Sequence, residues 1–436
     1  KYPNVTPEIF GQEINDMTYA ISESDMMLKE LDHDIAYGNS LIVKTPSKLG
    51  DAFPNEKFDY MLSNPPYGVD WKKYEEDIKS EAKRGFKGRY GAGLPRTSDG
   101  SLLFMMHMIS KMKESETGSR MAVVFNGSPL FTGEAGKTDN ENSIRKWIIE
   151  NDWLEAIVAL PKNLFFNTGI QTYIWIITNK KNPKRKGKVQ LVNAESFSDK
   201  MKKKVGDKSN EITTAQIKDI TDIYKSFKES ENCKIFKNSD FGYCRVTVER
   251  PKKRRFQITD EGKDRLQQQK TFKSLPEVKS KKDVSQEDVL KIVNSLPTKA
   301  YKNYDDFKKV VQKEFEDKEL KPKSSIYTAI ENSFSERDDE ADPQLDKHGN
   351  LVPDSDLRDN ENIPLSQDID EYFEKEVKPY VPDAWIVDST RDNIGYEIPF
   401  TKYFYKYKPL RPLEEIDTEI RKLQKDIISG LDELMK

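Results

Sequence analysis

The sequence predicts an α/β protein with a doubly wound, mostly parallel sheet, followed by a mainly helical carboxyl-terminal region. In the first half, continuous apolar runs that end at turn residues, such as residues 58–62 and 121–125, alternate with helical stretches, as in a sheet covered on both faces. From about residue 196 onward, helix formers, lysine and acidic residues replace the strand-like runs. We therefore predict three regions, which are residues 1–195, 196–395 and 396–436.

Composition limits the classes of function. The chain has 436 residues, enough for two or three domains with a sizeable core. Its net charge of -3 gives no overall attraction to a polyanion, so nucleic acid must be met by local basic patches or through a partner. Cys233 and Cys244 lack the close spacing of a zinc site, and we expect reduced thiols and no metal. No apolar run approaches the roughly 20 residues of a membrane helix and no signal peptide is visible, so we expect a cytoplasmic protein.

The first predicted strand, Glu8–Ile14, ends in an acid and is followed by a helical stretch over residues 16–31. In nucleotide-binding α/β folds an acid at such a strand end accepts hydrogen bonds from ribose hydroxyls, which favours this role for Glu13. The alternative is an exposed glutamate that caps the following helix. A second short strand, Asp34–Leu41, ends in Gly-Asn-Ser and by itself indicates only a strand and a turn.

The run Phe58–Leu62 predicts a buried parallel strand, because its apolar residues are continuous and two prolines prevent its extension. The tetrapeptide Asn64–Tyr67 then lies at the carboxyl end of a strand, where open α/β sheets bind ligands. The side-chain carbonyl of Asn64 and the backbone carbonyls at the prolines are converging acceptors for a planar amino group, such as the exocyclic amine of adenine or cytosine, or a side-chain amide. Tyr67 adds a face for stacking, worth about 1 to 3 kcal/mol per base. The alternative is a strand end followed by a turn.

This tetrapeptide resembles the Asn-Pro-Pro-Tyr motif of amino-directed methyltransferases that use S-adenosylmethionine. Flanking matches, from Phe10–Asn15 to Gly395–Thr401, make most of the chain similar to the modification subunit of type I restriction-modification systems, a family of N-6 adenine-specific DNA methyltransferases. The resemblance implies a methyltransferase (Rossmann-like) sheet and S-adenosylmethionine as the cofactor. The residues that it implies for catalysis are Asn64, Pro65, Pro66 and Tyr67. Those that it implies for cofactor binding are Glu13, Ile14, Asp34, Asn39 and Ser40.

Two features of this family are not found in the sequence. The first strand, with the glycine-rich turn that holds the methionine part of the cofactor, should precede Glu8–Ile14, and a helical amino-terminal domain should precede both. We therefore expect the sequence to be part of a longer protein. The sheet that it forms is expected to lack its first strand.

Residues 69–98 contain glycines interleaved with cations and predict a flexible flap that closes on a phosphate backbone, with a disordered surface loop as the alternative. The cations are Lys83, Arg84, Lys87, Arg89 and Arg96. Beyond it, the connector 161–170 carries Phe165 and Phe166 beside a strand end. We predict that one of the two forms a second stacking face, opposite Tyr67, for a base turned out of the helix. The alternative is that both phenylalanines seal the edge of the sheet.

Charged segments and one apolar seam complete the pattern. The basic stretches Lys180–Lys188, between two strand-like runs, and Arg250–Arg255 are interpreted either as phosphate contacts or as solvated faces. The acidic stretch 336–370 lacks the spacing of a calcium loop and is attributed to charge repulsion and solvation. Residues 413–435 predict an amphipathic helix that pairs with another helix or docks on the protein's own core. Its apolar residues are Ile416, Ile420, Leu423, Ile427, Ile428, Leu431 and Leu434.

Taken with the residues, the resemblance implies the modification subunit of a type I complex, which transfers a methyl group from S-adenosylmethionine to the exocyclic amine of a flipped adenine in DNA. Accepting the hydrogens of the amine at Asn64 and at the Pro65 carbonyl localises its lone pair, so that no histidine, cysteine or metal is required. The implied partners are DNA, a specificity subunit that meets the carboxyl-terminal helix, a restriction (motor/nuclease) subunit and a second modification subunit. Two alternatives are methylation of a glutamine amide in protein, and a non-catalytic scaffold that binds DNA or a partner.

Overall fold

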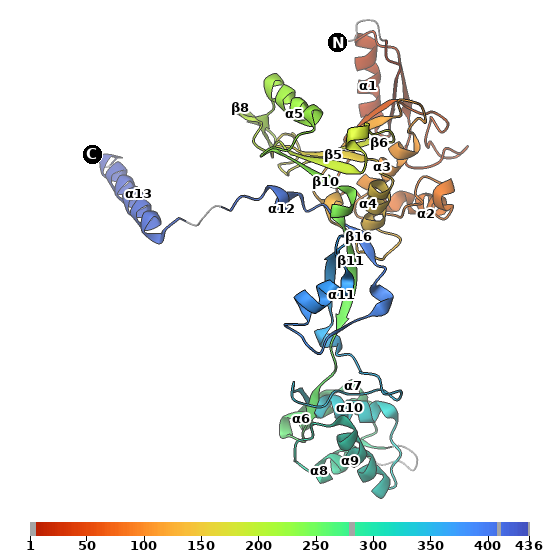
Figure 1. Ribbon diagram of the computed structural model, residues 1–436, viewed down its shortest axis with the longest axis vertical. Coiled ribbons are helices and arrows are strands. Elements are labelled where there is room, and N and C mark those ends of the chain that lie inside the picture. The colour runs from red at the N-terminus through yellow and green to blue at the C-terminus, as the bar shows by residue number, and fades with distance from the viewer. Residues whose placement is uncertain (1–5, 279–283, 408–410, 435–436) are drawn as a thin grey trace. The chain divides into compact units, whose positions relative to one another are not determined.

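The chain forms two compact units (Figure 1). The computed structural model describes residues 6–278, 284–407 and 411–434. Unit 1 combines the ranges Lys1–Gly133, Thr138–Phe241 and Glu397–Lys436, and unit 2 combines Glu134–Lys137 with Gly242–Tyr396. Strands therefore continue well past residue 195, where the sequence predicts that they end, and the first change of unit after the sheet comes at residue 241.

The main sheet of unit 1 has six strands in the order β10–β7–β5–β6–β4–β3. Their bounds are β3 (Tyr60–Ser63), β4 (Arg120–Phe125), β5 (Leu154–Ala159), β6 (Tyr173–Thr178), β7 (Lys188–Asn193) and β10 (Cys233–Lys237). Strands β3, β4, β5 and β7 run in one direction, and β6 and β10 run in the other. The sheet is thus mixed rather than mostly parallel. The reason is local: β6 follows its neighbour β5 with no helix between them, and parallel pairing of neighbours requires a crossover.

A two-stranded parallel sheet precedes the main sheet in the chain. It contains β1 (Ile9–Glu13) and β2 (His33–Tyr37), which are connected by α1 (Asp16–Leu28). The Phe10 ring contacts the rings of Phe53 and Phe58 at centroid distances of 5.4 and 5.3 Å, so the start of β1 lies close to the chain that enters β3. The predicted strand–helix–strand unit is confirmed.

Strand β3 is less buried than the sequence predicts. Tyr60 is 79% exposed and Leu62 is 85% exposed. Both side chains project from the same face because they alternate along the strand. Among the described residues, β3 pairs only with β4 and lies at the edge of the six-stranded sheet. The prediction of a buried strand was therefore wrong. A continuous apolar run indicates a strand with two covered faces and two neighbouring strands, whereas β3 has one exposed face and one neighbour.

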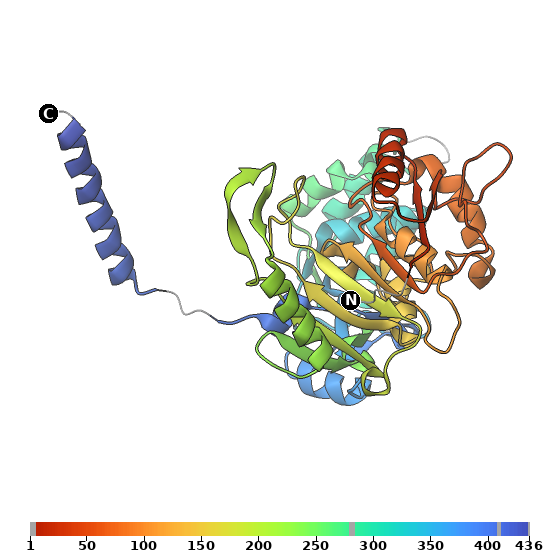
Figure 2. The same cartoon turned by 90° about the horizontal axis from the view of Figure 1, so that it is seen from above.

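Helices pack on the sheet of unit 1 (Figure 2). Among them, α3 (Ser101–Ser110) contacts β4 and α5 (Thr214–Ser226) contacts β7, and unit 1 also contains α2 (Glu75–Ala82) and α4 (Glu141–Glu150). All six residues of β5 are buried, so both faces of the sheet are covered at its centre. On one face, Ile220 and Ile223 of α5 pack against Val158 and Val192. Unit 1 also includes the hairpin β8 (Asp199–Val205) and β9 (Lys208–Glu211), and the helices α12 (Phe400–Phe404) and α13 (Leu413–Leu434).

Unit 2 contains both a small sheet and a helical cluster. Its strands are β11 (Gly242–Glu249), β12 (Arg254–Phe256), β13 (Ser335–Arg337), β14 (Asp359–Pro364), β15 (Trp385–Ile386) and β16 (Ile394–Tyr396). Its helices are α6 (Asp260–Gln268), α7 (Lys270–Lys273), α8 (Gln286–Ser295), α9 (Tyr304–Asp317), α10 (Ser324–Phe334) and α11 (Ile369–Tyr372). Helices α6 to α10 share an apolar core around Ile292, Phe315 and Ile330. Helices thus predominate within residues 260–278 and 284–334, whereas β14, β15 and β16 pair with β11 in an antiparallel sheet.

The basic run 250–255 is neutralised within unit 2 by the acidic stretch 336–370 and also by Asp383, which lies beyond that stretch. Arg250 and Lys253 both bind Asp383, each at 3.0 Å. Further pairs join Arg254 to Asp354 and Asp356, and Arg255 to Glu336. The two segments are far apart in the sequence, so their pairing was not predicted. The interpretation of the basic run as a phosphate contact is not supported, because its arginines already have carboxylate partners.

Candidate active site

The tetrapeptide begins directly after β3, as predicted, and its asparagine is already oriented. Asn64 and Pro66 are exposed, Pro65 is buried and Tyr67 is half-buried. The Tyr67 hydroxyl donates a hydrogen bond to Asn64 Oδ1 at 2.5 Å. Burial raises the pKa of Tyr67 to about 12, so the hydroxyl keeps its proton and remains a donor at neutral pH. The sequence did not predict this bond, which fixes the direction in which the Asn64 carbonyl points.

Three parallel strands place their carboxyl ends at one edge of the sheet. Because β3, β4 and β5 run in the same direction, Asn64, Asn126 and the connector 161–170 lie at that edge. Phe166 is 61% exposed, and the Lys208 ammonium lies over its ring at 4.9 Å from the centroid. The two connector phenylalanines are thus at the predicted edge, but β5 is three strand positions from β3, roughly 14 Å away. Phe165, next to Phe166 in the chain, is half-buried. Stacking of either ring opposite Tyr67 stays a prediction.

Asn126, which was not among the predicted site residues, and Arg96, predicted as a cation of segment 69–98, lie at the same edge. Asn126 follows β4 as Asn64 follows β3, and its Oδ1 accepts a hydrogen bond from the Ser128 amide at 3.1 Å. Arg96 donates to Ser128 Oγ at 3.3 Å, and 47% of its side chain is exposed. The repeated pattern of an asparagine after an apolar strand was the available signal. Arg96 of segment 69–98 thus lies near the tetrapeptide's edge of the sheet.

The candidate ribose-binding acid uses one of its oxygens to bind the backbone just before α1. Glu13 Oε1 accepts hydrogen bonds from the amides of Ile14 and Asn15 at 2.7 and 2.8 Å, at the start of α1. The N-cap of α1 is Asn15, whose Oδ1 accepts from the Thr18 amide at 3.0 Å, so the alternative of Glu13 as the cap of that helix is not supported. The other oxygen, Oε2, has no hydrogen-bond partner among the residues that the structure describes, and the neighbouring Ile14 is 46% exposed. Glu13 thus has one structural oxygen and one oxygen open to a ligand.

The turn after β2 brings two more candidates to Glu13. The Gly38 amide donates to the Glu13 backbone carbonyl at 2.9 Å, so the chain that leads to Asn39 and Ser40 passes directly beside that residue. Asn39 is buried, and its Oδ1 accepts from the Leu41 amide at 3.0 Å. Asp34 is not brought to this group. It is level with Phe10 in the strand pair, three residues or roughly 10 Å from the level of Glu13.

Segment 69–98 is a packed element rather than an open flap. It contains α2, and Tyr90 and Leu94 are buried. Arg89, predicted to bind phosphate, instead forms a buried ion pair with Glu81 at 2.6 Å. Arg84 and Lys87 line a groove of about 1250 Å³ together with residues that precede β3 and follow β6. That groove is at the edge of the sheet opposite Asn64, because β6 runs antiparallel to β3's neighbour β4.

The basic stretch 180–188 lies at that opposite edge as well. It connects β6 to β7, but β5 lies between these two strands, so the stretch is not a hairpin turn. Lys181 is buried against Asp152 at 2.5 Å, and the buried Arg185 is 3.5 Å from Glu155. These two cations therefore have internal partners, and the stretch is not placed to hold phosphates at the edge where Asn64 lies.

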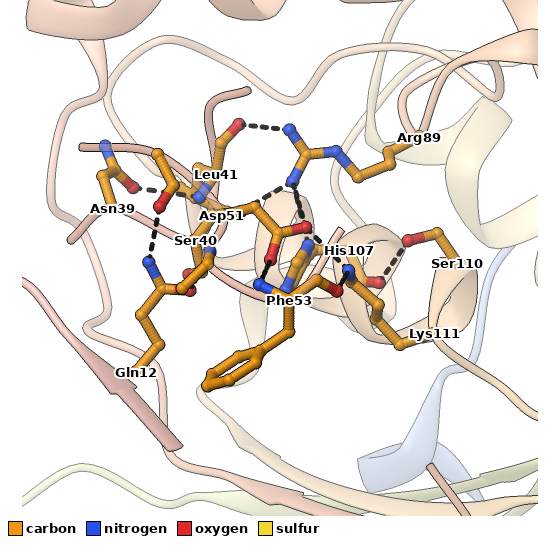
Figure 3. A network of polar contacts seen from close by, with 12 residues as sticks. Gln12, Asn39, Ser40, Leu41, Asp51, Phe53, Arg89, His107, Ser110 and Lys111 are labelled. Atoms are coloured by element: carbon orange, nitrogen blue, oxygen red, sulfur yellow. Dashed lines mark hydrogen bonds and ion pairs between the residues drawn. The ribbon is translucent and has the colours of Figure 1, made fainter. Parts of the chain in front are cut away.

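A buried polar network joins the turn after β2 to segment 69–98 and α3 (Figure 3). Lys111 binds Asp51 at 2.7 Å, and Arg89 Nη1 lies 2.9 Å from His107 Nδ1. Burial, aided by the positive charge of Arg89 and Lys111, lowers the pKa of His107 to about 4, against the opposing effect of Asp51 and Glu81. His107 is therefore neutral at physiological pH, and its Nδ1 accepts a hydrogen bond from Arg89. These polar partners come from segments that are apart in the chain, so the sequence did not indicate them.

A histidine that folds in the neutral form makes stability depend on pH. Below its ordinary pKa of 6.5, the unfolded chain binds a proton at His107 and the folded protein does not, until the pH reaches about 4. The free energy of unfolding is therefore expected to fall as the pH drops from 7 to 5, and less steeply in a His107→Gln variant, which cannot titrate. Urea unfolding followed by tryptophan fluorescence at both pH values measures this. His348→Gln, at an exposed histidine of unit 2, controls for the loss of a histidine. If the free energy of unfolding fell equally steeply with pH in the wild type and in His107→Gln, the assignment of a neutral His107 would be contradicted.

The described residues contain no cluster of three or more histidine, cysteine, aspartate or glutamate side chains arranged to hold a metal ion. Cys233 and Cys244 are both free and buried, and burial raises the pKa of each thiol. Within the described ranges, none of the helices combines the length and the hydrophobicity that crossing a bilayer requires.

Residues 3–250 match the family described as N-6 DNA methylase. The chain is 28% identical to the type I restriction enzyme MjaIX methylase subunit of Methanocaldococcus jannaschii, over 55% of this chain and 39% of that protein. It is 29% identical to the HindI methylase subunit of Haemophilus influenzae, over 53% of this chain and 50% of that protein. It thus spans about two fifths to one half of these relatives. A type I methyltransferase subunit from Streptococcus thermophilus, of known structure, shares 23% identity over 55% of this chain and 52% of that chain, with a TM-score of 0.43. Because the family match covers more than half of its residues, this protein belongs to the N-6 DNA methylase family.

Proposed function

We propose that the protein is the modification subunit of a type I restriction-modification complex. It transfers a methyl group from S-adenosylmethionine to the exocyclic amine of an adenine that is flipped out of DNA. The observation that carries the proposal is the position of Asn64: its exposed amide follows the carboxyl end of β3 and is oriented by the Tyr67 hydroxyl. Family membership supports the same activity.

The residues present suit amine chemistry without a general base. An amide oxygen has two lone pairs, so Asn64 Oδ1 has a second acceptor site besides the one that Tyr67 occupies. Together with the Pro65 carbonyl, it accepts the hydrogens of the amine and localises the nitrogen lone pair for attack. Positioning and fixed dipoles then supply the rate acceleration. Tyr67 contributes one stacking face, and Phe165 or Phe166 the other.

The candidate cofactor-binding residues at β1 and β2 suit only part of the cofactor, its ribose. Glu13 Oε2 is available to ribose hydroxyls, with Ile14, Asn39 and Ser40 beside it, and Asp34 is the least well placed of the predicted contacts. S-adenosylmethionine, when bound, supplies an electrophilic methyl group on its sulfonium. We propose that the strand and the glycine-rich turn for its methionine part come from residues outside this sequence. The unpaired edge of β3 and the exposed Tyr60 and Leu62 support a further strand and covering element there.

Partners follow from the tail and from the names of the relatives. The apolar seam of α13 is exposed from Ile416, at 37%, to Leu431, at 55%, and is available to pair with another helix. We propose that it pairs with the specificity subunit, in a cytoplasmic complex with DNA, the restriction subunit and a second modification subunit. Target recognition is then assigned to the specificity subunit.

The function is tested by transfer of a labelled methyl group from S-adenosylmethionine to unmethylated DNA, with and without the specificity subunit. We expect label on the N6 atom of adenine when both subunits are present. Label in glutamine side chains of protein would instead support amide methylation. Absence of transfer under either condition by the intact protein would favour a non-catalytic scaffold and overturn the proposal.

A Glu13→Gln variant tests the cofactor side of the site. Glutamine keeps an acceptor oxygen for the amides of Ile14 and Asn15 but replaces the open carboxylate oxygen by a donor. We expect the Kd for S-adenosylhomocysteine to rise about 10-fold, since hydrogen bonds to charged groups contribute about 1.5 to 3 kcal/mol. Isothermal titration calorimetry measures this. Glu8→Gln makes the same change at an exposed glutamate just before β1 and is expected to bind as the wild type does. Equal Kd values for Glu13→Gln and the wild type would remove Glu13 from the site.

A further inference from the structure

Arg89 is the most highly connected side chain of the network in Figure 3. Its guanidinium donates to the backbone carbonyls of Ser40 and Leu41, at 2.6 and 3.1 Å. The same group binds both oxygens of Glu81, at 2.7 and 2.6 Å, and contacts His107 at 2.9 Å. Only 11% of the Arg89 side chain is exposed. One buried cation therefore joins segment 69–98, helix α3 and the turn that carries Asn39 and Ser40.

The two carbonyl acceptors explain why an arginine occupies this position. Ser40 and Leu41 lie in a turn, where their carbonyls are not in a sheet ladder, and buried carbonyls require donors. A guanidinium offers five donors in a planar fork and can serve two successive carbonyls and a carboxylate together, whereas an ammonium cannot. Tyr90 supports the same turn, because its hydroxyl donates to the Leu41 carbonyl at 2.6 Å.

The chain around Arg89 is shaped to bring it there. A Cβ atom at Gly88 would lie 2.6 Å from the Glu81 carbonyl oxygen, and one at Gly91 would lie 2.4 Å from a backbone atom of Gly85. Only glycine allows such close approach of two backbone segments. Burial disfavours the Glu81 carboxylate, but hydrogen bonds from Arg89 outweigh this and hold its pKa below the ordinary value. The charge that balances Arg89 is therefore present at neutral pH.

We propose that Arg89 is a positioning residue for the cofactor side of the active site. It fixes the position of the turn with Asn39 and Ser40 relative to the segment that follows Tyr67. The distance between the cofactor contacts and the tetrapeptide is thereby kept constant. Arg89 itself contacts neither the base nor the cofactor. This inference rests on the proposed function and deepens it.

Two substitutions test the inference, each of which leaves part of the network in place. Arg89→Lys keeps the charge and loses the fork, and Tyr90→Phe keeps the buried ring and removes one hydrogen bond to Leu41. We expect Arg89→Lys to raise the Kd for S-adenosylhomocysteine by about 10-fold or more, because small misplacements of site residues are costly. Tyr90→Phe should raise it roughly 3-fold, the worth of one neutral hydrogen bond. The KM for S-adenosylmethionine should rise with the Kd, and kcat at saturating cofactor should change less.

A third variant distinguishes misplacement of the cofactor contacts from a general loss of stability. Ile78→Val destabilises α2, the helix that carries Glu81, at a fully buried side chain with no part in the network. If it lowers the melting temperature as much as Tyr90→Phe does but leaves the Kd unchanged, the positioning role is supported. Unchanged Kd in Tyr90→Phe and Arg89→Lys, or equal weakening by Ile78→Val, overturns it. If Arg89→Lys does not fold, Tyr90→Phe decides the question. A wild-type protein that binds no S-adenosylhomocysteine and transfers no methyl group overturns the proposed function, and this inference with it.

Discussion

An Asn64→Ala variant is expected to lose methyl transfer by at least about 100-fold, the range found when one preorganised group is removed from a polar active site. Alanine removes the side-chain acceptor, and the Pro65 carbonyl alone cannot hold both hydrogens of the amine. The fold should not suffer, because Asn64 is exposed and its side chain has only the Tyr67 hydroxyl as a partner among the described residues. Single-turnover transfer of a labelled methyl group to unmethylated DNA measures the loss.

Two further variants sharpen this result. Asn64→Asp keeps an acceptor for the amine and for Tyr67 but adds a charge, so it should retain more activity than alanine. Asn151→Ala changes an exposed asparagine that precedes β5, at the edge of the sheet opposite Asn64, and should transfer methyl groups at the wild-type rate. If Asn64→Ala lost thermal stability and affinity for S-adenosylhomocysteine together with activity, Asn64 would be a structural residue. Full activity in Asn64→Ala would remove it from the mechanism.

Local sequence patterns predicted the parts of the fold and site that depend on neighbours in the chain. Strand β4 follows from an apolar run bounded by turn residues, and β1 and β2 correspond to the predicted strands Glu8–Ile14 and Asp34–Leu41. The place of Asn64 at a strand end follows from the two prolines, which cannot continue the ladder, and this is the step on which the functional argument depends. For Glu13 the sequence left two alternatives, a ribose acceptor or a helix cap, and the structure makes Asn15 the cap of α1.

Features that depend on distant pairings were not predicted. The exposure of Tyr60 and Leu62 depends on which strands flank β3, and the sequence pattern cannot show whether a neighbour is present. The environment of Arg89 depends on Glu81 and on the turn at Ser40, 49 residues away, so charge alone suggested a phosphate contact. The pairing of Arg250 with Asp383 spans 133 residues and could not be inferred from either charged run. Charge in the sequence thus locates cations but not their partners.

The Tyr67 side chain has two separable contributions, which Tyr67→Ala and Tyr67→Phe distinguish. Phenylalanine keeps the ring for stacking and loses only the hydrogen bond that orients Asn64, so we expect a loss of several-fold in kcat. Alanine also removes the stacking face, which is worth about 1 to 3 kcal/mol per base, or roughly 5- to 150-fold in binding of the flipped base. Fluorescence of 2-aminopurine at the target position reports flipping, and methyl transfer reports chemistry.

The order of these effects tests the assignment of roles. If Tyr67 stacks on the base, flipping should be near the wild-type level in Tyr67→Phe and strongly reduced in Tyr67→Ala. A Tyr380→Ala variant removes a ring that is 83% exposed in unit 2 and serves as the control. Equal flipping in Tyr67→Ala and the wild type would assign stacking to the connector phenylalanines alone. If Tyr67→Phe instead lost as much methyl transfer as Tyr67→Ala, the principal contribution of Tyr67 would be its hydroxyl, which orients Asn64. That hydroxyl keeps its proton at neutral pH, so the orienting hydrogen bond does not depend on pH there.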